Sequence, residues 1–343
     1  VVTDGTAVLG LGDIGPEAAM PVMEGKAALF KTFGDVDAVP ICIDTKDPAK
    51  IIETVRFLQP SFAGINLEDI SSPKCYDIEC ELKKICDIPV FHDDQHGTAI
   101  ACLAAVIGAL RFVKKDMKPA KFVVNGCGAA GSAIGRLLIS MGAENVTMVD
   151  RFGALYEGID ANLDRIQSYL ATVTNKEHKK GTLADIAKGA DVLIGVSAPN
   201  VFTKEIIASM ADKAIVFALA NPVPETSYAD AIEAGAAVAG TGRSDSPNQV
   251  NNVTVFPGVF RGAIDVRAKA ITEEMKVAAV YAISELIDEK DLRADYVVPD
   301  AFDPRVAPAV AAAVARVAME TGIARIKVDP EEVRANTMKR VGR

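Results

Sequence analysis

The segment at residues 121–150, KFVVNGCGAAGSAIGRLLISMGAENVTMVD, decides the fold class. Its apolar pattern predicts a strand, a helix and a second strand, with a glycine-rich loop between the first strand and the helix. Glycines in such a loop let the backbone turn tightly and approach a pyrophosphate, whose charge meets the N-terminus of the helix. The segment therefore predicts a dinucleotide-binding βαβ unit. The loop residues are Gly126, Cys127, Gly128, Ala129, Ala130 and Gly131.

Asp150 ends the second predicted strand and bears on the choice of dinucleotide. An acid at this position accepts hydrogen bonds from the ribose hydroxyls and repels the 2′-phosphate of NADP. Arg151, the next residue, would attract that phosphate, so the sequence favours NAD but leaves NADP open. A tight strand–helix turn without a ligand is the alternative interpretation.

A second loop, at residues 10–15, also has the glycine spacing of a dinucleotide site. It contains Asp13, whose negative charge would repel a pyrophosphate, and Pro16 follows at once. We therefore expect this loop to shape an edge of the substrate site instead.

Composition limits the class of protein. The chain has 343 residues, enough for two domains, and 37 Lys and Arg against 46 Asp and Glu give a net charge of −9, so we expect no nucleic-acid partner. No uncharged apolar run reaches the roughly 18 residues that span a membrane, so we expect no membrane-spanning segment. The six cysteines are scattered without a CxxC pair, which favours reduced thiols and a cytoplasmic location.

Strands and helices alternate along most of the chain, which is typical of an α/β fold with parallel sheets. In the first third, predicted strands at 39–44, 62–69 and 88–94 are joined by helical segments, so their carboxyl ends should share one edge of a sheet. From about Arg267 the pattern is mostly helical and rich in alanine.

These patterns predict two domains. A substrate- and metal-binding domain is expected over residues 1–115 and a Rossmann dinucleotide-binding domain over 116–262. The helical segment 263–343 is expected to pack back on the first domain. The substrate is expected in the cleft between the substrate domain and the Rossmann domain.

Two pairs of carboxylates follow successive predicted strands: Glu68 with Asp69, and Asp93 with Asp94. Oxygen ligands without a cysteine set suit a hard divalent ion, Mg²⁺ or Mn²⁺. Acids that only cap the following helices are the alternative. The histidines beside the second pair, His92 and His96, are expected to hold the loop by hydrogen bonds rather than to bind the metal.

Lys26 lies within an apolar helical stripe, where a surface lysine would not be expected. Burial disfavours the ammonium form, lowers the pKa and could make this lysine a general base. A lysine that reaches solvent, or one paired with a carboxylate, is the alternative. The stripe consists of Val22, Met23, Leu29, Phe30 and Phe33.

Three asparagines offer neutral amides that could hold a carboxylate or a carboxamide. Asn221 ends a predicted strand, and Asn251 and Asn252 lie in the segment SPNQVNNVTVFPG. Taken alone, they would be interpreted as ordinary turn residues.

At this point six motifs, in order along nearly the whole chain, resemble the malic enzymes, in particular their shorter bacterial form. The motifs are GTAVLGLGDIGPEAAMPVMEGKAALF, NLEDISSP, FHDDQHGTA, NGCGAAGSA, ALANPVPE and GRSDSPNQVNNVTVFPGVFRGA. The resemblance implies oxidative decarboxylation of L-malate to pyruvate and CO₂, with reduction of NAD or NADP and a requirement for Mg²⁺ or Mn²⁺. It also implies a homodimer or a higher homo-oligomer.

The resemblance further implies roles for individual residues. Lys26 would be the general base and Asp93 an acid that tunes it. The metal ligands would be Glu68, Asp69 and Asp94. The cofactor would be held by the glycine loop, Asp150, Arg151 and Asn221, and the substrate by Asn251 and Asn252.

Two departures from the family pattern stand out. The family's proton donor for C3 is a tyrosine upstream of residue 1, so the resemblance implies that this sequence lacks that segment. Larger animal and plant forms carry a substrate-binding arginine where Ala7 stands here, which leaves the group that binds the malate carboxylate open.

Two other functions remain as alternatives. A metal-independent amino-acid or hydroxy-acid dehydrogenase would leave four carboxylates at strand ends unexplained. A non-catalytic dinucleotide-binding module would have no use for a desolvated lysine at position 26.

Overall fold

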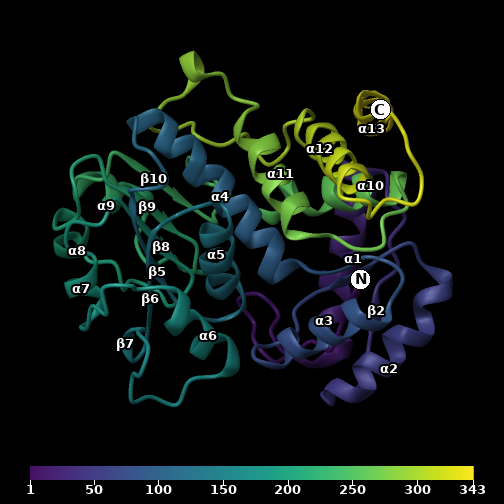
Figure 1. The fold of residues 1–343 in the computed structure, drawn as a ribbon, viewed down its shortest axis with the longest axis horizontal. Coiled ribbons are helices and arrows are strands. Elements are labelled where there is room, and N and C mark those ends of the chain that lie inside the picture. The colour runs from purple at the N-terminus through teal and green to yellow at the C-terminus, as the bar shows by residue number, and fades with distance from the viewer. Residues whose placement is uncertain (343) are drawn as a thin grey trace. The chain divides into compact units, whose positions relative to one another are not determined.

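The computed structural model describes residues 1–342, and their contacts divide them into two compact units. Unit 1 comprises residues 1–100, 252–286 and the C-terminal part from 302, and unit 2 comprises 101–251 and 287–301. Figure 1 labels the elements of both units. The expected α/β fold with parallel sheets is confirmed.

Unit 1 is built on a four-stranded parallel sheet with the order β2-β1-β3-β4. Helix α1 packs against β1 and β2, and α2 packs against α3. Asp47 caps α2 by accepting a hydrogen bond from Ala49 N, and Pro48 begins the helix. Its strands are β1 (Val2–Thr3), β2 (Ile41–Cys42), β3 (Ile65–Leu67) and β4 (Val90–His92). The helices on these strands are α1 (Gly15–Gly34), α2 (Pro48–Leu58), η1 (Gln59–Ser61) and α3 (Lys74–Ile85).

The C-terminal helices complete unit 1. Helix α12 contacts α10, α11 and α13. An aromatic cluster lies beneath them: the rings of Phe30 and Phe256 are 4.6 Å apart, and Phe260 touches both Phe30 and Phe91. These helices are η2 (Asn252–Thr254), α10 (Phe256–Asp265), α11 (Glu273–Ser284), α12 (Val306–Glu320) and α13 (Pro330–Val341).

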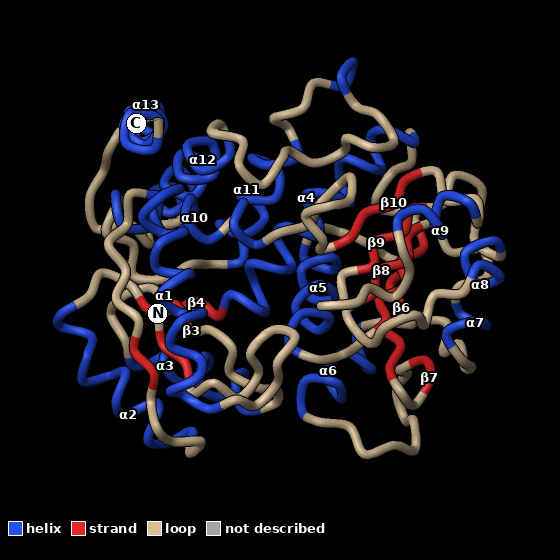
Figure 2. The backbone as a smooth tube through the Cα atoms, turned by 180° about the vertical axis from the view of Figure 1, so that it is seen from behind, coloured by secondary structure: helices blue, strands red, loops and turns tan. Residues whose placement is uncertain are grey.

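Unit 2 is built on a six-stranded sheet with the order β10-β9-β8-β5-β6-β7, in which only β7 is antiparallel. Figure 2 shows these strands side by side in red. The chain leaves β5 (Lys121–Asn125) toward β6 (Asn145–Asp150) and later returns to β8 (Val192–Gly195) on the other side of β5. The strand order therefore reverses at β5, the place where α/β sheets bind ligands.

The remaining elements of unit 2 are the other strands of this sheet and a set of helices. The strands are β7 (Gly153–Ala154), β9 (Ile215–Ala218) and β10 (Val238–Thr241). The helices are α5 (Ala129–Ser140), α6 (Arg165–Val173), α7 (Leu183–Ile186), α8 (Lys204–Ala208), α9 (Tyr228–Glu233) and η3 (Glu289–Asp291). One helix, α4 (Asp93–Val113), begins in unit 1 and continues into unit 2.

Three local expectations differ from the structure. Strand β1, which pairs with both β2 and β3, was not predicted, because two residues are too short for an apolar pattern. The third predicted strand ends at His92, and Asp93 and Asp94 form the first turn of α4. Val22, expected in the buried stripe of α1, is 41% exposed, and the buried positions include Ala19, Met23, Lys26 and Phe30.

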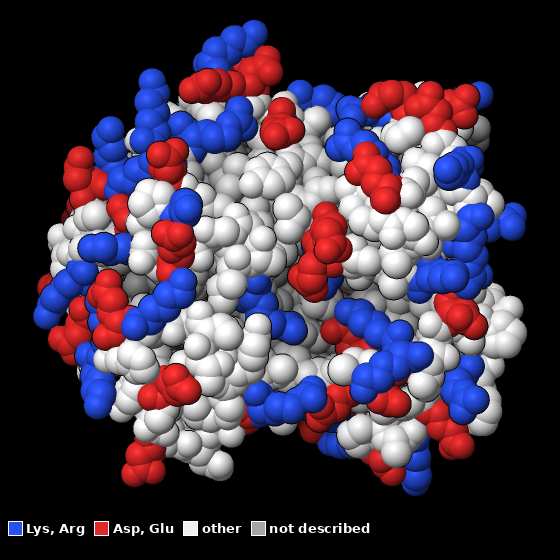
Figure 3. Space-filling view, viewed as in Figure 1, with Lys and Arg blue, Asp and Glu red and all other residues white. Residues whose placement is uncertain are grey.

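Among the described residues, α4 alone is long and apolar enough to cross a membrane by length and composition. Asp93 and Asp94 open this helix and Arg111 lies in its last turn, so its uncharged part is shorter than a membrane span. Most of the apolar stretch is buried inside the structure, and the core helix of a globular protein meets the same criteria. On the face drawn in Figure 3, Lys and Arg side chains lie interspersed with Asp and Glu.

We expect Gly108→Ala to destabilise the protein, because a Cβ at Gly108 would lie 1.8 Å from the carbonyl oxygen of Val297. Forcing the backbones apart should cost about 1–3 kcal/mol of unfolding free energy, measured by urea denaturation. Gly25→Ala is the matched control, since nothing lies within 4 Å of a Cβ at this helical position. The control should gain about 0.5–1 kcal/mol, and equal stability of the two variants would contradict the close approach at Gly108.

Candidate active site

Three carboxylates meet at the carboxyl edge of the sheet in unit 1. Glu68 and Asp69 follow β3 directly, Asp94 lies in the first turn of α4, and one oxygen from each lies within 4.8 Å of the others. Strands β3 and β4 are neighbours in the sheet, which brings the two segments together. The backbone also ties them, because Asp69 N donates to Asp94 Oδ2 at 2.9 Å.

Lys26 approaches this cluster from α1. Its side chain is only 7% exposed, and its Nζ donates to Glu68 Oε1 at 3.1 Å and to Asp93 Oδ2. The ammonium group also lies 3.9 Å from the centre of the Phe256 ring. Both predicted features of Lys26, burial and a carboxylate partner, thus occur together.

The direction of the Lys26 pKa differs from the expectation. Burial does oppose the charged form, but the charges of Asp93 and Glu68 outweigh it and raise the pKa of Lys26 above that of a free lysine. The sequence predicted that Lys26 is buried but gave the wrong direction for its pKa shift. That direction depends on two carboxylates that only the fold brings close to Lys26.

Asp93 is fully buried, and small or amide-bearing neighbours surround it. Asn252 donates to its Oδ2, the same atom that meets Lys26. A Cβ at Gly97 would lie 1.9 Å from Asp93 Oδ1, so only glycine leaves room for this carboxylate one turn along α4. No described residue hydrogen-bonds to Asp93 Oδ1.

The crowding of acids raises their pKa values. Burial is the main cause, followed by the charge of neighbouring carboxylates, and together they raise the pKa of Asp69 to about 8 and that of Asp94 to about 7. Burial also raises the pKa of Asp93 to about 8, although the charge of Lys26 opposes this. Raised pKa values mean that these acids bind protons more readily, and a cation held between them would relieve the same crowding.

This donor set fits a hard divalent cation. All three clustered ligands are carboxylate oxygens, the type that Mg²⁺ and Mn²⁺ bind, and no cysteine shares the cluster. Asn66, which the sequence patterns did not reveal, donates to Glu68 Oε2 at 2.8 Å and holds that carboxylate in place. An alternating strand pattern cannot distinguish such an inward asparagine from a core residue.

A buried hydrogen-bond network supports the turn that carries Asp93 and Asp94. Glu79, on α3, accepts hydrogen bonds from His96 Nε2 at 2.8 Å and from the backbone N–H of His92 at 3.1 Å, and it pairs with Lys83 at 2.7 Å. On the other side of the ring, Lys276 on α11 donates to His96 Nδ1 at 3.0 Å. A carboxylate at Nε2 and an ammonium group at Nδ1 favour the neutral imidazole with its proton on Nε2.

The expectation for the two histidines holds in part. The His96 ring does hold the turn by hydrogen bonds, whereas His92 does so through its backbone. The His92 ring is buried, with Nε2 3.8 Å from Asp94 Oδ2, too far for a hydrogen bond. Neither Glu79 nor Lys276 was singled out from the sequence, because both lie on ordinary amphipathic helices.

In unit 2, the glycine loop borders a cavity of about 700 Å³ at the carboxyl ends of β5, β6 and β8. The residues that line it include Gly126, Cys127, Gly128, Asp150, Arg151 and Ser197. A Cβ at Gly131 would strike Gly126 O at 1.7 Å, so this glycine is required by packing. A Cβ at Gly128 would have no neighbour within 4 Å, which leaves the backbone open toward the cavity.

Helix α5 begins at this cavity without a side-chain cap, so its first N–H groups are free to meet an anion. Asp150 is held in place: its Oδ1 accepts from Arg151 N at 2.7 Å and its Oδ2 from Gln167 Nε2 at 2.9 Å. The cavity, the uncapped helix and the anchored acid fit a dinucleotide.

Of the three asparagines expected at the site, Asn252 alone contacts the lysine and carboxylate cluster through a described hydrogen bond. Asn252 joins the lysine and carboxylate site through Asp93. Asn221 follows β9 in unit 2, is exposed, and donates to Leu219 O at 3.3 Å. It is absent from the described residues that line the cofactor cavity, and Asn251 is half-buried next to Asn252.

A dinucleotide-binding sheet, together with acids that surround a buried lysine in the other unit, defines a cofactor-dependent oxidoreductase. Two family models cover most of the chain: "Malic enzyme, N-terminal domain" matches residues 1–83 and "Malic enzyme, NAD binding domain" matches residues 95–319. The chain belongs to the malic enzyme family.

Named relatives agree with this assignment. The bifunctional malic/malolactic enzyme of Bacillus subtilis is 59% identical over 339 residues, covering 99% of this chain and 83% of that protein. The NAD-dependent malic enzyme of Geobacillus stearothermophilus is 52% identical, with 95% and 68% covered. The NADP-dependent malic enzyme of Escherichia coli is 47% identical, and the chain spans 44% of its length.

Solved structures have the same fold. A malic enzyme from Pyrococcus horikoshii matches with a TM-score of 0.96 and 45% identity, covering all of this chain and 81% of that one. The malic enzyme of Entamoeba histolytica matches with a TM-score of 0.95 and 41% identity, covering all of this chain and 73% of that one.

We predict that the His96 network makes the protein sensitive to acid. Burial and the ammonium groups of Lys276 and Lys83 lower the pKa of His96 to about 3, against the opposing charge of Glu79. Between pH 6.5 and about 3, the unfolded state therefore binds a proton that the folded state does not, and stability falls as the pH falls. This group should cost about 2 kcal/mol between about pH 7 and about pH 5.

Urea unfolding at both pH values measures this loss. His96→Gln keeps one donor and one acceptor but does not titrate, so its stability should change less over the same interval. Equal losses in the two proteins would show that other groups cause the acid sensitivity.

Proposed function

We propose that this protein catalyses the oxidative decarboxylation of L-malate to pyruvate and CO₂ with reduction of NAD or NADP. The observation that carries the proposal is the buried Lys26 between Glu68 and Asp93, beside three clustered carboxylates, in a chain of the malic enzyme family. In this proposal the domains are those expected over residues 1–115, 116–262 and 263–343.

Glu68, Asp69 and Asp94 would hold the divalent ion. When bound, the dinucleotide accepts the hydride from C2 of malate, and the ion polarises the C2 oxygen and favours the loss of CO₂. Asn66 keeps Glu68 in position, and the hydrogen bond from Asp69 N orients Asp94. Such supports are typical of metal-binding carboxylates.

Lys26 and Asp93 would handle the proton of the C2 hydroxyl. The charges of Asp93 and Glu68 raise the pKa of Lys26 and favour its ammonium form, and the direct contact with Asp93 gives the proton a path to that carboxylate. When Asp93 holds it, the Lys26 amine has a free lone pair for the substrate hydroxyl. Asn252 donates to the same Asp93 oxygen and would steady that carboxylate during the transfer.

On the cofactor side, the residues at 126–131 would cradle the pyrophosphate, and Asp150 would accept from the ribose. The anchoring of Asp150 by Gln167 supports a preference for NAD, since the charge that repels a 2′-phosphate cannot turn away freely. Arg151, Asn221 and Asn251 are proposed to contact cofactor or substrate. We also propose a homo-oligomer, a dimer in the simplest case, in the cytoplasm.

The metal-independent dehydrogenase is disfavoured by the acid cluster. A reaction without a metal gives no reason to gather Glu68, Asp69 and Asp94 within 4.8 Å and to raise two of their pKa values. A binding module without catalysis is disfavoured by Lys26, whose burial costs free energy that simple dinucleotide binding does not require.

We predict that Lys26→Met lowers kcat by a factor of about 100 or more, because the proton acceptor for the C2 hydroxyl is lost. The assay follows absorbance of the reduced dinucleotide with L-malate, Mn²⁺ and NAD or NADP. Lys31→Met, on the exposed face of the same helix, should keep the activity of the wild type.

Product analysis completes this test. Pyruvate and reduced dinucleotide in equal amounts, dependent on Mn²⁺, support the proposal. Lactate without net reduction would indicate instead the malolactic reaction in the name of the Bacillus subtilis relative. A rate that survives in Lys26→Met, or one that needs no metal, would contradict the roles assigned above.

Asp150→Ser should shift the cofactor preference toward NADP by about tenfold in the ratio of the two kcat/KM values, because the repulsion of the 2′-phosphate is removed. Arg151→Ser should move the same ratio in the opposite direction. An unchanged ratio in both variants would mean that other residues choose the dinucleotide.

A further inference from the structure

Glu225 is a buried acid in unit 2 to which none of the roles above refers. Its side chain is fully buried, and the groups that hydrogen-bond to its carboxylate are neutral donors. A buried carboxylate without a counter-charge is costly unless hydrogen bonds satisfy it. Its partners therefore show what it stabilises.

The partners of Glu225 are donors on two loops that follow adjacent strands. Oε1 accepts from the backbone N–H of Ser197 at 2.7 Å and from its hydroxyl at 3.1 Å. Oε2 accepts from the backbone N–H of Ala220 at 3.0 Å. Ser197 follows β8 and Ala220 follows β9, neighbours in the sheet.

A third strand joins through Ser197. The side-chain amide of Asn125, the last residue of β5, donates to the Ser197 hydroxyl at 2.7 Å, and that hydroxyl donates to Glu225. Asn125 directly precedes the glycine loop. One carboxylate thus connects the ends of β5, β8 and β9, and both Asn125 and Ser197 line the cofactor cavity.

The surrounding backbone leaves room for this carboxylate. A Cβ at Gly195 would lie 2.4 Å from the carboxyl carbon of Glu225, so any larger residue in the last position of β8 would displace it. The main chain of Glu225 is also held, because its carbonyl accepts from Phe202 N at 3.0 Å.

We propose that Glu225 is a positioning residue of the dinucleotide site: its carboxylate holds the loops after β5, β8 and β9 in the geometry that binds the cofactor. This inference rests on the proposed function. It also gives Asn221 a fixed location, since Asn221 follows Ala220 directly and the Ala220 N–H is anchored.

Glu225→Gln is the discriminating substitution. A carboxylate accepts at both oxygens, whereas an amide presents one oxygen and one NH₂ group. The two oxygens of Glu225 face different backbone N–H groups, so one of those N–H groups would meet a donor and lose its partner in the variant. Either the Ser197 loop or the Ala220 loop should then move.

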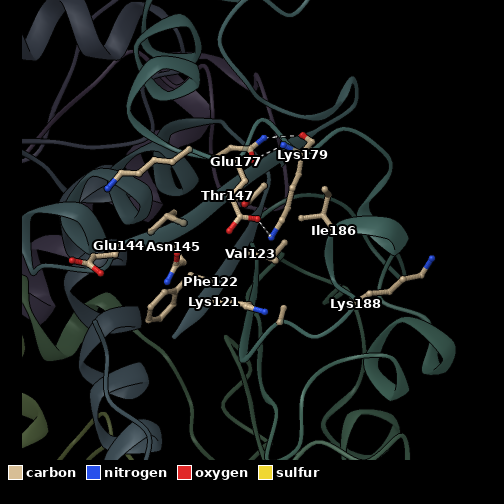
Figure 4. A pocket seen from close by; sticks show the side chains of 14 residues that line it. Lys121, Phe122, Val123, Glu144, Asn145, Thr147, Glu177, Lys179, Ile186 and Lys188 are labelled. Carbon is tan, nitrogen blue, oxygen red and sulfur yellow. Dashed lines mark hydrogen bonds and ion pairs between the residues drawn. The ribbon is translucent and has the colours of Figure 1, made fainter. Parts of the chain in front are cut away.

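Asp191→Asn serves as a matched control. Asp191 is also a partly buried acid of unit 2 that accepts from a backbone N–H, that of Lys121 at 2.9 Å, but it precedes β8 instead of following it. Lys121 lies at the opposite edge of the sheet, beside the small cavity of about 40 Å³ in Figure 4, where Lys179 pairs with Glu177. In Asp191→Asn one of the two acceptor oxygens becomes an NH₂ group, which should lower stability without reaching the glycine loop.

The experiment measures the Kd of NAD and of NADH by isothermal titration calorimetry, and the Kd of Mn²⁺ as a second readout. We expect Glu225→Gln to weaken dinucleotide binding by about tenfold and to leave Mn²⁺ binding unchanged, and Asp191→Asn to change neither. In the steady state, the KM for the dinucleotide should rise while the KM for malate stays within about twofold.

A second variant protects the test against misfolding. Glu225→Asp keeps the charge but is one methylene shorter, so it should hold one loop and bind the dinucleotide with an affinity between those of the wild type and Glu225→Gln. Wild-type affinity in both variants, or an equal loss in Asp191→Asn, would overturn the inference. A wild-type protein that binds no dinucleotide would instead overturn the proposed function on which it rests.

Discussion

The charge imbalance around Lys26 is the constraint on which the rest of unit 1 depends. Four acids lie near one ammonium group: Glu68 and Asp93 contact it, Asp69 is buried beside them, and Asp94 is half-buried. Burying charge is costly, and like charges raise that cost. The chain tolerates the arrangement because neutral amides and backbone N–H groups satisfy the carboxylates, and because a divalent cation would offset the excess negative charge.

That constraint explains features that otherwise look unrelated. Gly97 lacks a side chain so that Asp93 fits one turn before it. Asn66 and Asn252 donate to the acids without adding charge. Behind the same turn of α4 the charges reverse: Lys83 and Lys276 face Glu79 and His96, so the turn that carries Asp93 and Asp94 is anchored from its far side by positive groups.

The sequence predicted the parts of the molecule that local patterns encode. Local patterns located four features: the glycine loop, Asp150, the acid pairs and Lys26. Each lies at the end of a strand or on the apolar stripe of a helix. The sequence did not predict the raised pKa of Lys26, the network at Glu79 or the contacts of Glu225. Most of these contacts join residues 13 to 180 positions apart, which meet only in the fold. Strand β1 was missed for a related reason, because its two residues become a strand only by pairing on both sides.

In both units, carboxylates hold the loops at the strand ends by accepting hydrogen bonds from backbone N–H groups. A functional side chain at a strand end lies on a loop that has no strand partner in the sheet. The backbone N–H groups of that loop must therefore be held by other hydrogen-bond acceptors. In unit 1, Glu79 accepts the N–H of His92 next to Asp93, and Asp94 accepts the N–H of Asp69. In unit 2, Glu225 accepts the N–H groups of Ser197 and Ala220. An acid suits this task better than an amide, because both of its oxygens accept and it can join two loops at once. The buried carboxylates of this fold differ in how far their oxygens are satisfied. Both oxygens of Glu79 and of Glu225 accept hydrogen bonds, whereas Asp93 Oδ1 accepts none from the described residues.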